Sequence, residues 1–191
     1  MNKFILTLAA LLVCGTASAG TEHYLRRDGN HVQHLKITRI GDDNLLMAYT
    51  HVAHDCMIGN GIIMANGASL AGHVLVEDLA ILGGFSLVHQ FCRIGRQSFS
   101  GMGSVISRDI PPYVMVGGSP TRPRGINTVG LERKGYNSDA VLQIKRAFKI
   151  LYKSRLKLEE AIEQLQGMAV NSPEIAPMLD FLRQSGRSII R

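Results

Sequence analysis

Aliphatic residues recur at every sixth position between residues 40 and 106. Counted from Ile40, eleven of these twelve positions carry Ile, Leu, Val or Met, and only Ser100 departs from the rule. In most units the next residue is Gly or Ala, and the residue four positions after the start is usually small. A fixed period of six residues is the sequence mark of a parallel β-helix.

Each six-residue unit in such a repeat makes one side of a triangular coil, with the aliphatic residue pointing inward. Three sides give a coil of 18 residues, so residues 40 to about 111 provide roughly four coils, stacked at the ~4.8 Å spacing of paired strands. A β-sandwich would instead show alternation with period two and irregularly spaced turns. We therefore expect a mainly β fold built as a parallel β-helix.

The repeat stops at the sequence Asp109-Ile-Pro-Pro112. Consecutive prolines cannot donate backbone N–H groups to a ladder, so we expect the β-helix to end there. The next stretch, 113–136, is rich in Gly, Pro and Arg and is interpreted as a connector.

The last part of the chain has the 3.6-residue period of amphipathic helices. We expect a first helix capped by Ser138, a second over Leu158–Leu165, and a third that starts at Ser172 with Pro173 in its first turn. The apolar face of the first helix comprises Ala140, Ile144, Ala147, Phe148 and Leu151. The predicted organisation is a leader at 1–19, an unpatterned segment at 20–33, a β-helix at 34–112, the connector at 113–136 and a helical domain at 137–191.

Composition agrees with thin layers of small aliphatic side chains. Hydrophobic residues make up 46% of the chain, aromatic residues only 6%, and there are 20 glycines. The net charge of +6 suits phosphate-bearing ligands, anionic membranes or nucleic acid. Aromatic and basic residues do not interleave, which argues against a nucleic-acid partner.

The first 19 residues have the pattern of a secretory signal. Lys3 supplies the positive charge, 4–13 the apolar run, and Ala17-Ser-Ala19 a cleavage site. The run is too short to span a bilayer, so we expect no stable membrane insertion. A lipoprotein signal through Cys14 is weaker, because bulky Val13 precedes it.

The two remaining cysteines lie inside the repeat, 36 residues apart. Cys56 and Cys92 therefore indicate neither a disulfide framework nor a C-x-x-C metal site, and are interpreted as small buried thiols.

Candidate chemistry follows from the coil length, because residues 18 apart stack on one edge. His54, Gly72 and Gln90 form such a column, each two positions after an aliphatic residue of the repeat. The column puts an imidazole beside an unobstructed backbone N–H, which suits acyl transfer: His acts as general base and the N–H binds the developing oxyanion. Asp55 would support the imidazole if the chain turns a corner there.

Two other interpretations of the histidines stay open at this point. His51, His73 and His89 crowd the same zone, and several histidines in one region could bind Zn²⁺. The spacing of His51 and His54 suits a helix better than a strand, and no set of acidic ligands accompanies them, so we expect no metal. Structural or solvated histidines are the other alternative. Arg133-Lys134 offers cations for a phosphate, although such pairs are usually solvated surface.

Several segments together closely resemble one enzyme family, the acyl-[acyl-carrier-protein]–UDP-N-acetylglucosamine O-acyltransferases. The resemblance runs from about residue 34 to the C-terminus. It is carried by Ile40-Gly-Asp-Asp-Asn-Leu-Leu-Met47, His51-Val-Ala-His-Asp-Cys56, Leu70-Ala-Gly-His73, Gly83-Gly84, Val88-His-Gln-Phe-Cys92, Asp109-Ile-Pro-Pro-Tyr113 and Gly130-Leu-Glu-Arg-Lys-Gly135.

This resemblance implies a homotrimer of left-handed β-helices with helical C-terminal domains and active sites between subunits. It implies transfer of a 3-hydroxyacyl group from acyl carrier protein to the glucosamine 3-hydroxyl of UDP-N-acetylglucosamine, the first step of lipid A synthesis, in the cytoplasm. No cofactor is implied, since the acyl carrier protein is the donor substrate.

Site residues also follow from the resemblance. His54 is similar to the general base, Asp55 to its partner and the Gly72 N–H to the oxyanion donor. Positions similar to substrate contacts are His51, His73, His89 and Gln90, and positions similar to nucleotide contacts are Asn127 and Arg133. In the family a Gly at the position of Met102 leaves the acyl groove long, so we expect Met102 to favour a donor nearer 3-hydroxydecanoyl than 3-hydroxymyristoyl.

The sequence also departs from the family pattern. Family members carry further coils before the segment that matches Ile40, and an acidic residue is expected where Val129 stands. The sequence therefore predicts an N-terminally truncated member. The alternatives are an inactive truncated trimeric β-helix, an exported β-helix scaffold, and a coenzyme A-dependent hexapeptide acetyltransferase, for which 118–122 would be a coil-end motif.

Overall fold

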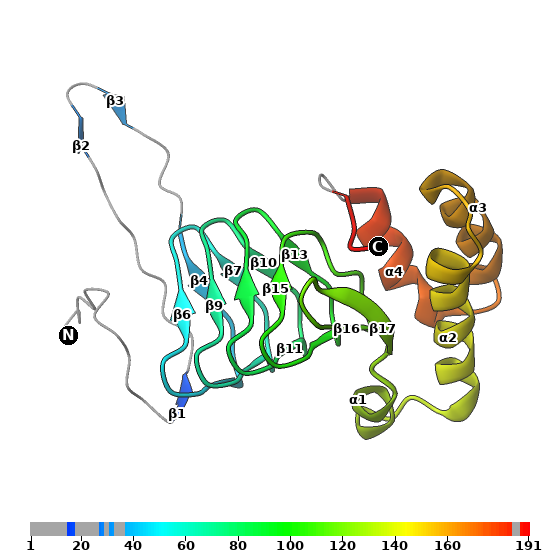
Figure 1. The fold of residues 1–191 in the computed structure, drawn as a ribbon, viewed down its shortest axis with the longest axis horizontal. Coiled ribbons are helices and arrows are strands. Elements are labelled where there is room, and N and C mark those ends of the chain that lie inside the picture. Colours follow the sequence, from blue (N-terminus) through cyan, green and yellow to red (C-terminus); the bar gives the residue numbers. More distant parts are fainter. Residues whose placement is uncertain (1–14, 18–26, 29–30, 33–36, 185–187) are drawn as a thin grey trace.

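The computed structural model describes residues 15–17, 27–28, 31–32, 37–184 and 188–191. Figure 1 shows a stack of β coils with a group of helices at its C-terminal end. The predicted fold class, a parallel β-helix followed by helices, is confirmed. The predicted leader lies outside the described residues except for the short strand β1 (Gly15–Ala17), which pairs antiparallel with the first coil.

Three sheets, built mainly of parallel strands, form the sides of the coils. One has the order β13-β10-β7-β4, the second β15-β12-β9-β6, and the third β1-β5-β8-β11-β14-β16-β17. The first contains β4 (Arg39–Ile40), β7 (Met57–Ile58), β10 (Leu75–Val76) and β13 (Arg93–Ile94). The second contains β6 (His51–Val52), β9 (Ser69–Leu70), β12 (Leu87–Val88) and β15 (Val105–Ile106). The third includes β5 (Asn44–Leu46), β8 (Ile63–Met64), β11 (Ile81–Leu82) and β14 (Phe99–Ser100). A separate antiparallel pair joins β2 (Arg27–Asp28) to β3 (His31–Val32).

Strand register follows the predicted period of 18 residues. Val52 pairs with Leu70, Leu70 with Val88, and Val88 with Ile106. The aliphatic residues of the repeat point inward and are buried from Ile58 onward. The exception, Ser100, is also buried, and its hydroxyl lies 2.8 Å from that of Ser86, so the polar atom has a partner in the core.

Each coil turns its corners with residues in the left-handed backbone region. One edge uses Asp43, Gly61, Leu79 and Gln97, a second Tyr49, Gly67, Phe85 and Gly103, and a third Asp55, His73 and Phe91. Non-glycine residues adopt positive φ values uncommonly, so the corner geometry is imposed by the coil. It also turns neighbouring side chains to the same side, which a regular strand does not do.

The prediction that the β structure ends at the prolines was wrong. Strand β16 (Val114–Gly117) continues the third sheet by pairing in parallel with β14, and β17 (Arg122–Ile126) then pairs antiparallel with β16. The prolines end the six-residue repeat but not the sheet, because the chain regains free N–H groups after Pro112. The stretch interpreted as a connector also contains a short helix, α1 (Thr128–Arg133).

The helical part follows the predicted order. It comprises α2 (Ser138–Lys153), α3 (Leu158–Ala169), the 3₁₀ turn η1 (Pro173–Ile175) and α4 (Ala176–Gln184). Four residues of the predicted apolar face of α2 are buried, and Ala140 is half-buried. The predicted cap was wrong by one residue: Asn137 is the N-cap, its side-chain oxygen accepting from the Ala140 N–H.

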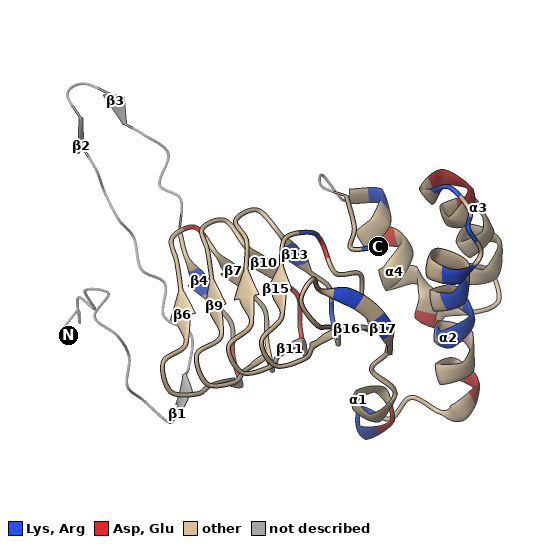
Figure 2. Ribbon diagram, in the orientation of Figure 1, with Lys and Arg blue, Asp and Glu red and all other residues tan. Residues whose placement is uncertain are grey.

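Arg93 of the coils contacts the helical part; Figure 2 shows basic segments on the coils, on β17 and on the helices. The Arg93 guanidinium lies 3.1 Å from Glu77 and 4.4 Å from the centre of the Phe181 ring on α4. The Ile190 N–H donates to the Asp109 carbonyl at 2.9 Å, so the last described residues return to the end of the coil stack. Within the described ranges, no helix is long and apolar enough to cross a membrane.

Candidate active site

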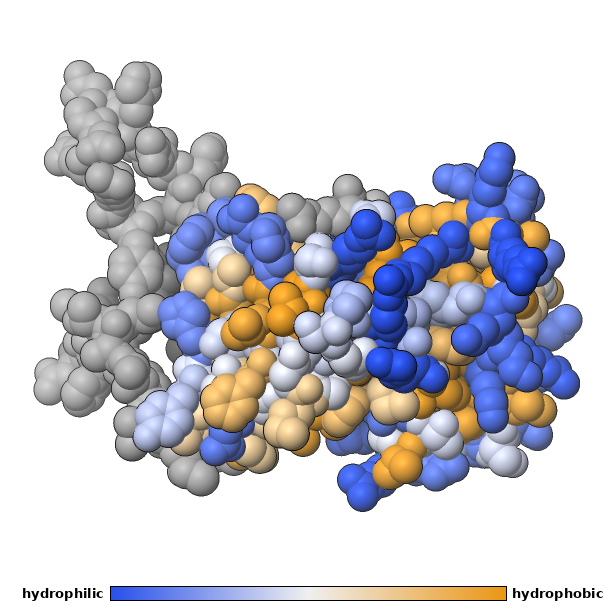
Figure 3. All heavy atoms as spheres, viewed as in Figure 1, coloured by the Kyte–Doolittle hydropathy of each residue, from blue (hydrophilic) through white to orange (hydrophobic). Residues whose placement is uncertain are grey.

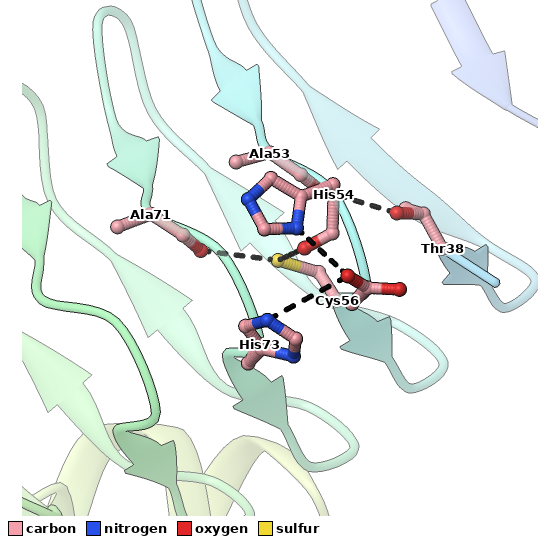
Figure 4. A network of polar contacts seen from close by, with 7 residues as sticks. Thr38, Ala53, His54, Cys56, Ala71 and His73 are labelled. Carbon is pink, nitrogen blue, oxygen red and sulfur yellow. Dashed lines mark hydrogen bonds and ion pairs between the residues drawn. The ribbon is translucent and has the colours of Figure 1, made fainter. Parts of the chain in front are cut away.

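The side chains of His54 and Asp55 form a hydrogen bond at one corner of the first described coil. Nδ1 of His54 lies 2.7 Å from Oδ2 of Asp55, and Figure 4 shows the carboxylate between the two labelled histidines. The sequence predicts that Asp55 supports the imidazole if the chain turns a corner there. The chain does turn at this point: Asp55 has φ 60, and the side chains of His54 and Asp55 point to the same side. The His54 side chain is 73% exposed and that of Asp55 only 16%, so the base faces solvent while its partner is held in the wall.

The next coil contributes His73 directly above Asp55 in the register. Nε2 of His73 lies 3.6 Å from the same carboxylate oxygen, and the two imidazoles meet edge to face at 5.1 Å. One coil further, Phe91 stacks on His73 with ring centres 4.6 Å apart. Asp55, His73 and Phe91 are therefore one column, in which the aromatic ring holds His73 against the carboxylate.

Gly72 lies against the His54 imidazole with no room for a side chain. A Cβ atom on Gly72 would stand 2.7 Å from Nε2 and 2.6 Å from Cε1 of His54, closer than real contacts allow. The glycine is needed here for close approach, since its φ is not in the left-handed region. The Gly72 N–H has no acceptor among the described residues.

Two of the equivalent N–H groups on another edge are paired by side chains. Asn60 also stands two positions after an aliphatic residue of the repeat, and its N–H donates to Oδ1 of Asp78 at 2.8 Å. The Asp42 N–H donates in the same way to Oδ1 of Asn60 at 2.7 Å. On that edge, Asn60 and Asp78 each cap the N–H of the coil before them. At Gly72 the cap would have to come from Gln90, which makes no such bond.

The floor of the corner is Cys56, a buried thiol. Its Sγ donates to the Ala71 carbonyl at 3.2 Å and to the His54 carbonyl at 3.7 Å, as Figure 4 shows. Burial raises the pKa of the thiol above its ordinary value, and the nearby Asp55 charge adds to the rise. Cys56 is thus a neutral hydrogen-bond donor that ties the backbone of His54 to the next coil.

This arrangement can take a proton and bind an oxyanion. A carboxylate only accepts hydrogen bonds, so Nδ1 of His54 carries the proton and Nε2 is the free acceptor, on the side of Gly72. The same three groups could also hold a metal ion, since ligand atoms of His54, Asp55 and His73 all lie within 4.8 Å of one another. Three N and O ligands in such a cluster are the kind of set that Zn²⁺ accepts.

The other predicted contacts on this side are exposed. His51 points outward from β6, and His89 and Gln90 lie on the turn after β12, with Nδ1 of His89 3.1 Å from the Gln90 carbonyl oxygen. All three belong to the edge and face that carry His54. The structure therefore brings six of the ten predicted site residues close to Asp55, namely His51, His54, Gly72, His73, His89 and Gln90.

The remaining three predicted residues lie elsewhere in the protomer. Met102 is 79% exposed at a different edge, across the sheet that contains β12 and β15. Asn127 caps α1: its Oδ1 accepts from the Gly130 N–H and its Nδ2 donates to the Gln97 carbonyl, each at 3.1 Å. Arg133 is exposed in the last turn of the same helix.

Sequence reasoning missed the contributions of Phe91 and Arg108. Phe91 follows His73 by one period of 18, and Arg108 follows Gln90 by the same period, so the column that begins at His54 ends at an arginine. The period alone would have found both residues.

Two family models match the chain. The one described as UDP N-acetylglucosamine O-acyltransferase, domain 2, matches residues 109–190, and the one for bacterial transferase hexapeptide repeats matches residues 37–72. The first covers the end of the coils and the helices, and the second the coils that carry His54 and Asp55.

Relatives with known names cover most of the chain. An acyl-[acyl-carrier-protein]–UDP-N-acetylglucosamine O-acyltransferase from Alkalilimnicola ehrlichii is 51% identical over 81% of this chain and 60% of its own length. An enzyme of the same name from Pseudomonas paraeruginosa is 45% identical over 89% of this chain and 68% of its own. The structure of LpxA from Acinetobacter baumannii superposes with a TM-score of 0.78 at 42% identity, covering 80% of this chain and 59% of that one. The chain thus spans about 60% of the length of the relatives it matches.

Proposed function

Because this chain belongs to the acyl-[acyl-carrier-protein]–UDP-N-acetylglucosamine O-acyltransferase family, we propose that it transfers a 3-hydroxyacyl group from acyl carrier protein to the glucosamine 3-hydroxyl of UDP-N-acetylglucosamine, the first step of lipid A synthesis. The observation that carries the proposal is the Gly72 N–H, which lies beside the His54 imidazole and has no acceptor within the described part of the chain. No cofactor is needed, because the thioester of the carrier protein supplies the acyl group.

The reaction begins at the free nitrogen of His54. Nε2 takes the proton of the sugar hydroxyl while the hydroxyl oxygen attacks the thioester carbonyl. Asp55 holds the imidazole by its Nδ1 proton at 2.7 Å and stabilises the imidazolium that forms. His73 shares the carboxylate and fixes its position.

The tetrahedral intermediate carries its negative charge on the former carbonyl oxygen. The Gly72 N–H donates to that oxygen, an interaction worth roughly 2.7–4 kcal/mol in comparable sites. Collapse of the intermediate expels the carrier thiol, which takes its proton from the His54 imidazolium. The products are the acylated nucleotide sugar and free carrier protein, and His54 is again neutral.

Substrate contacts are proposed for exposed side chains around this centre. His51, His89 and Gln90 surround the His54 edge and offer donors and acceptors to the sugar and the acyl hydroxyl. Asn127 and Arg133 lie on α1, at the helical end of the stack, where we propose the nucleotide contacts. The Arg133 guanidinium suits a diphosphate.

A homotrimer would complete this site. Large apolar side chains are exposed on the sheet of β12 and β15 and at its far edge, including Leu87 at 49%, Val105 at 51% and Phe85 at 65%. Figure 3 shows apolar side chains gathered over these coils. Packing against a second copy would bury them, and it would bring the Met102 edge of one protomer to the His54 edge of its neighbour.

Within such a trimer, Met102 would end the acyl groove and favour a donor nearer 3-hydroxydecanoyl than 3-hydroxymyristoyl. Both proposed substrates are cytosolic compounds, so we propose the cytoplasm as the place of the reaction.

The test is turnover by the purified chain, with 3-hydroxydecanoyl and 3-hydroxymyristoyl carrier protein as donors and His54→Ala as control. We expect acylated UDP-N-acetylglucosamine, faster formation from the shorter donor, and a loss of at least about 100-fold in His54→Ala. Comparable rates with both donors would refute the role of Met102.

Two outcomes would replace the proposal. No turnover above the His54→Ala control would indicate an inactive β-helix. Turnover with acetyl coenzyme A in place of the carrier protein would indicate a hexapeptide acetyltransferase.

A further inference from the structure

Three side chains at the His54 corner form a set of ligands that a transition metal ion accepts. Nδ1 of His54 lies 2.7 Å and Nε2 of His73 lies 3.6 Å from Oδ2 of Asp55, so both rings face one carboxylate oxygen (Figure 4). The ligand atoms of the three residues all lie within 4.8 Å of one another. Among the residues that the structure describes, this is the one group of three His, Cys, Asp or Glu side chains so placed.

This set differs from the one that the sequence argued against. The expectation of no metal rested on His51 and His54, whose spacing suits a helix better than a strand. In the structure, His54 and Asp55 come from one coil and His73 from the next, one period of 18 residues after Asp55. Asp55 and His73 have φ values of 60 and 62, so both stand at the same corner with their side chains on the same side. Stacking of coils therefore provides the acidic ligand that the histidines lack within one strand.

The distances are close to those around a tetrahedral zinc ion. Zn²⁺ binds His nitrogen at about 2.0–2.1 Å and carboxylate oxygen at about 2.0–2.2 Å, so neighbouring ligand atoms stand roughly 3.3 Å apart. The 3.6 Å between His73 and Asp55 nearly meets this value. The 2.7 Å between His54 and Asp55 would widen by about 0.6 Å, as the metal replaces the proton between these two atoms. The mostly exposed His54 ring has room for that rotation.

The surroundings of the three ligands favour binding and leave an entry path. Phe91 stacks on His73 with ring centres 4.6 Å apart and 11° between the ring planes, which holds this ligand in place. The Asp55 carboxylate contributes a negative charge, and the corner is open to solvent on the side of His54. Two imidazoles and one carboxylate are typical ligands of Zn²⁺, whereas Mg²⁺ prefers oxygen ligands.

We propose that Zn²⁺ binds to His54, Asp55 and His73 with its fourth position open to solvent, and that the bound ion stops acyl transfer. The binding site is independent of the proposed function, whereas the inhibition rests on it.

Inhibition follows from the position of the proton on the His54 ring. A neutral imidazole carries one proton, on either Nδ1 or Nε2. Without metal, the Asp55 carboxylate holds that proton at Nδ1, and Nε2 is the free acceptor. A metal ion at Nδ1 takes the lone pair of this nitrogen, so the proton moves to Nε2. Nε2 then has no lone pair for the proton of the sugar hydroxyl, and the general base is lost.

The first test is calorimetric titration of the full chain with Zn²⁺, with Mg²⁺ as the ion that should not bind. We expect His73→Ala to weaken the zinc site at least about 100-fold, because even residues that only orient a metal ligand usually contribute about 10–100-fold. Asp55→Asn, which keeps the shape of the side chain, should weaken it as well. His89→Ala is the matched control, since it removes an exposed histidine of the same face that lies outside the group.

The binding results decide the site without any turnover. Zinc affinity that is lost in His73→Ala and Asp55→Asn but kept in His89→Ala supports it. No binding to the wild type, or equal weakening in His73→Ala and His89→Ala, would overturn it. Nuclear magnetic resonance of ¹⁵N-labelled imidazoles should show that Zn²⁺ moves the His54 proton from Nδ1 to Nε2. A proton that stays at Nδ1 in the zinc-bound chain would overturn the assignment of His54 as a ligand.

A kinetic measurement then tests the inhibition. Initial rates of acyl transfer should fall at least about 100-fold when Zn²⁺ saturates the site, the usual contribution of a general base, and should recover when a chelator removes the ion. Turnover that depends on His54 but persists at saturating Zn²⁺ would refute the inhibition and leave the proposed function standing. A chain without turnover would refute the proposed function, and the binding results would still decide the zinc site.

Discussion

Two edges of the coil stack share one backbone but differ in what their side chains do. On the edge of Asn60 and Asp78, each side chain accepts a hydrogen bond from the N–H of the coil before it. On the edge of His54, the same repeat position holds Gly72, whose N–H has no acceptor among the described residues. The first edge is closed by side-chain hydrogen bonds at Asp42 and Asn60 and serves structure, whereas the second exposes a donor beside a base.

The two edges also differ in the hydrogen bonds of the buried residue behind each corner. Asn44 fills the first: its Nδ2 donates to the carbonyls of Gly41 and Gly59, and its Oδ1 accepts from the Ile62 N–H at 2.6 Å. Cys56 occupies the equivalent position beneath His54 and donates only weakly. The comparison teaches that the repeat determines where a side chain stands, while single substitutions in the repeat decide which edge can do chemistry.

The largest expected effect comes from copying the closed edge onto the open one. Gln90→Asp places a carboxylate where Asp78 stands on the other edge, within reach of the Gly72 N–H. Because this N–H is the proposed oxyanion donor, capping it should lower kcat roughly 100-fold or more. Gln90→Ala removes the same amide without adding a cap and is the control in steady-state kinetics. Equal rates in the two variants would refute the role of the free N–H.

The second largest effect is a loss of stability, and we expect it to be larger for a substitution at the closed edge than at the open edge. Asn44→Ala removes three hydrogen bonds, one of them buried and two partly buried, so we expect the free energy of unfolding to drop by about 2–3 kcal/mol. Cys56→Ala removes one sulfur atom from the equivalent corner and should cost about 1 kcal/mol. Urea unfolding at matched protein concentration measures both values. If Cys56→Ala lost more free energy of unfolding than Asn44→Ala, the claim that the Asn60 edge serves structure and the His54 edge serves chemistry would be contradicted.

The smallest effect concerns alkaline pH and the buried thiol beneath the open corner. Burial raises the pKa values of Cys56, Tyr113 and Tyr152 in the folded chain above their ordinary values. The unfolded chain therefore releases these protons at lower pH than the folded chain. Stability is complete below the unfolded pKa values and falls as pH rises above them, by at most about 1.4 kcal/mol per unit for each group. We expect a level free energy of unfolding from pH 7 to about 9 and a decline above it.

Cys56→Ala should remove the first part of that decline and leave the part caused by the tyrosines. Urea unfolding between pH 7 and 11 measures both profiles. A stability that stays level or rises with pH would contradict the burial argument.

Much of the fold could be predicted because the six-residue period is regular. The period gave the inward positions, the coils, and the stacking of His54, Gly72 and Gln90 on one edge. It fails after Pro112, where β16 and β17 form a hairpin that has no periodic pattern. The role of Asn127 as the N-cap of α1 could not be predicted either, because it depends on a helix of six residues within a Gly- and Pro-rich stretch.

The site was predictable in position but not in its bonds. Neither the missing acceptor of the Gly72 N–H among the described residues nor the caps that Asn60 and Asp78 provide could be predicted, because such caps depend on short side chains reaching across coils. The last coil is two residues shorter than the others, since Ile110 bridges to Ile94 and Met115 pairs with Phe99 at a spacing of sixteen, and the interrupted repeat conceals this. Both features arise where tertiary contacts, rather than local pattern, decide the geometry.

The most direct test of the account is one comparison of kcat between Gly72→Ala and Asn60→Ala, the same change to alanine at the same repeat position on the two edges. A methyl group at Gly72 would clash with the His54 ring at 2.6–2.7 Å, so we expect a loss of at least about 100-fold in proposed acyl transfer. Asn60→Ala should keep kcat within about twofold of the wild type, since it removes only a cap on the closed edge. Similar losses of kcat in both variants would contradict the claim that the open edge carries the chemistry.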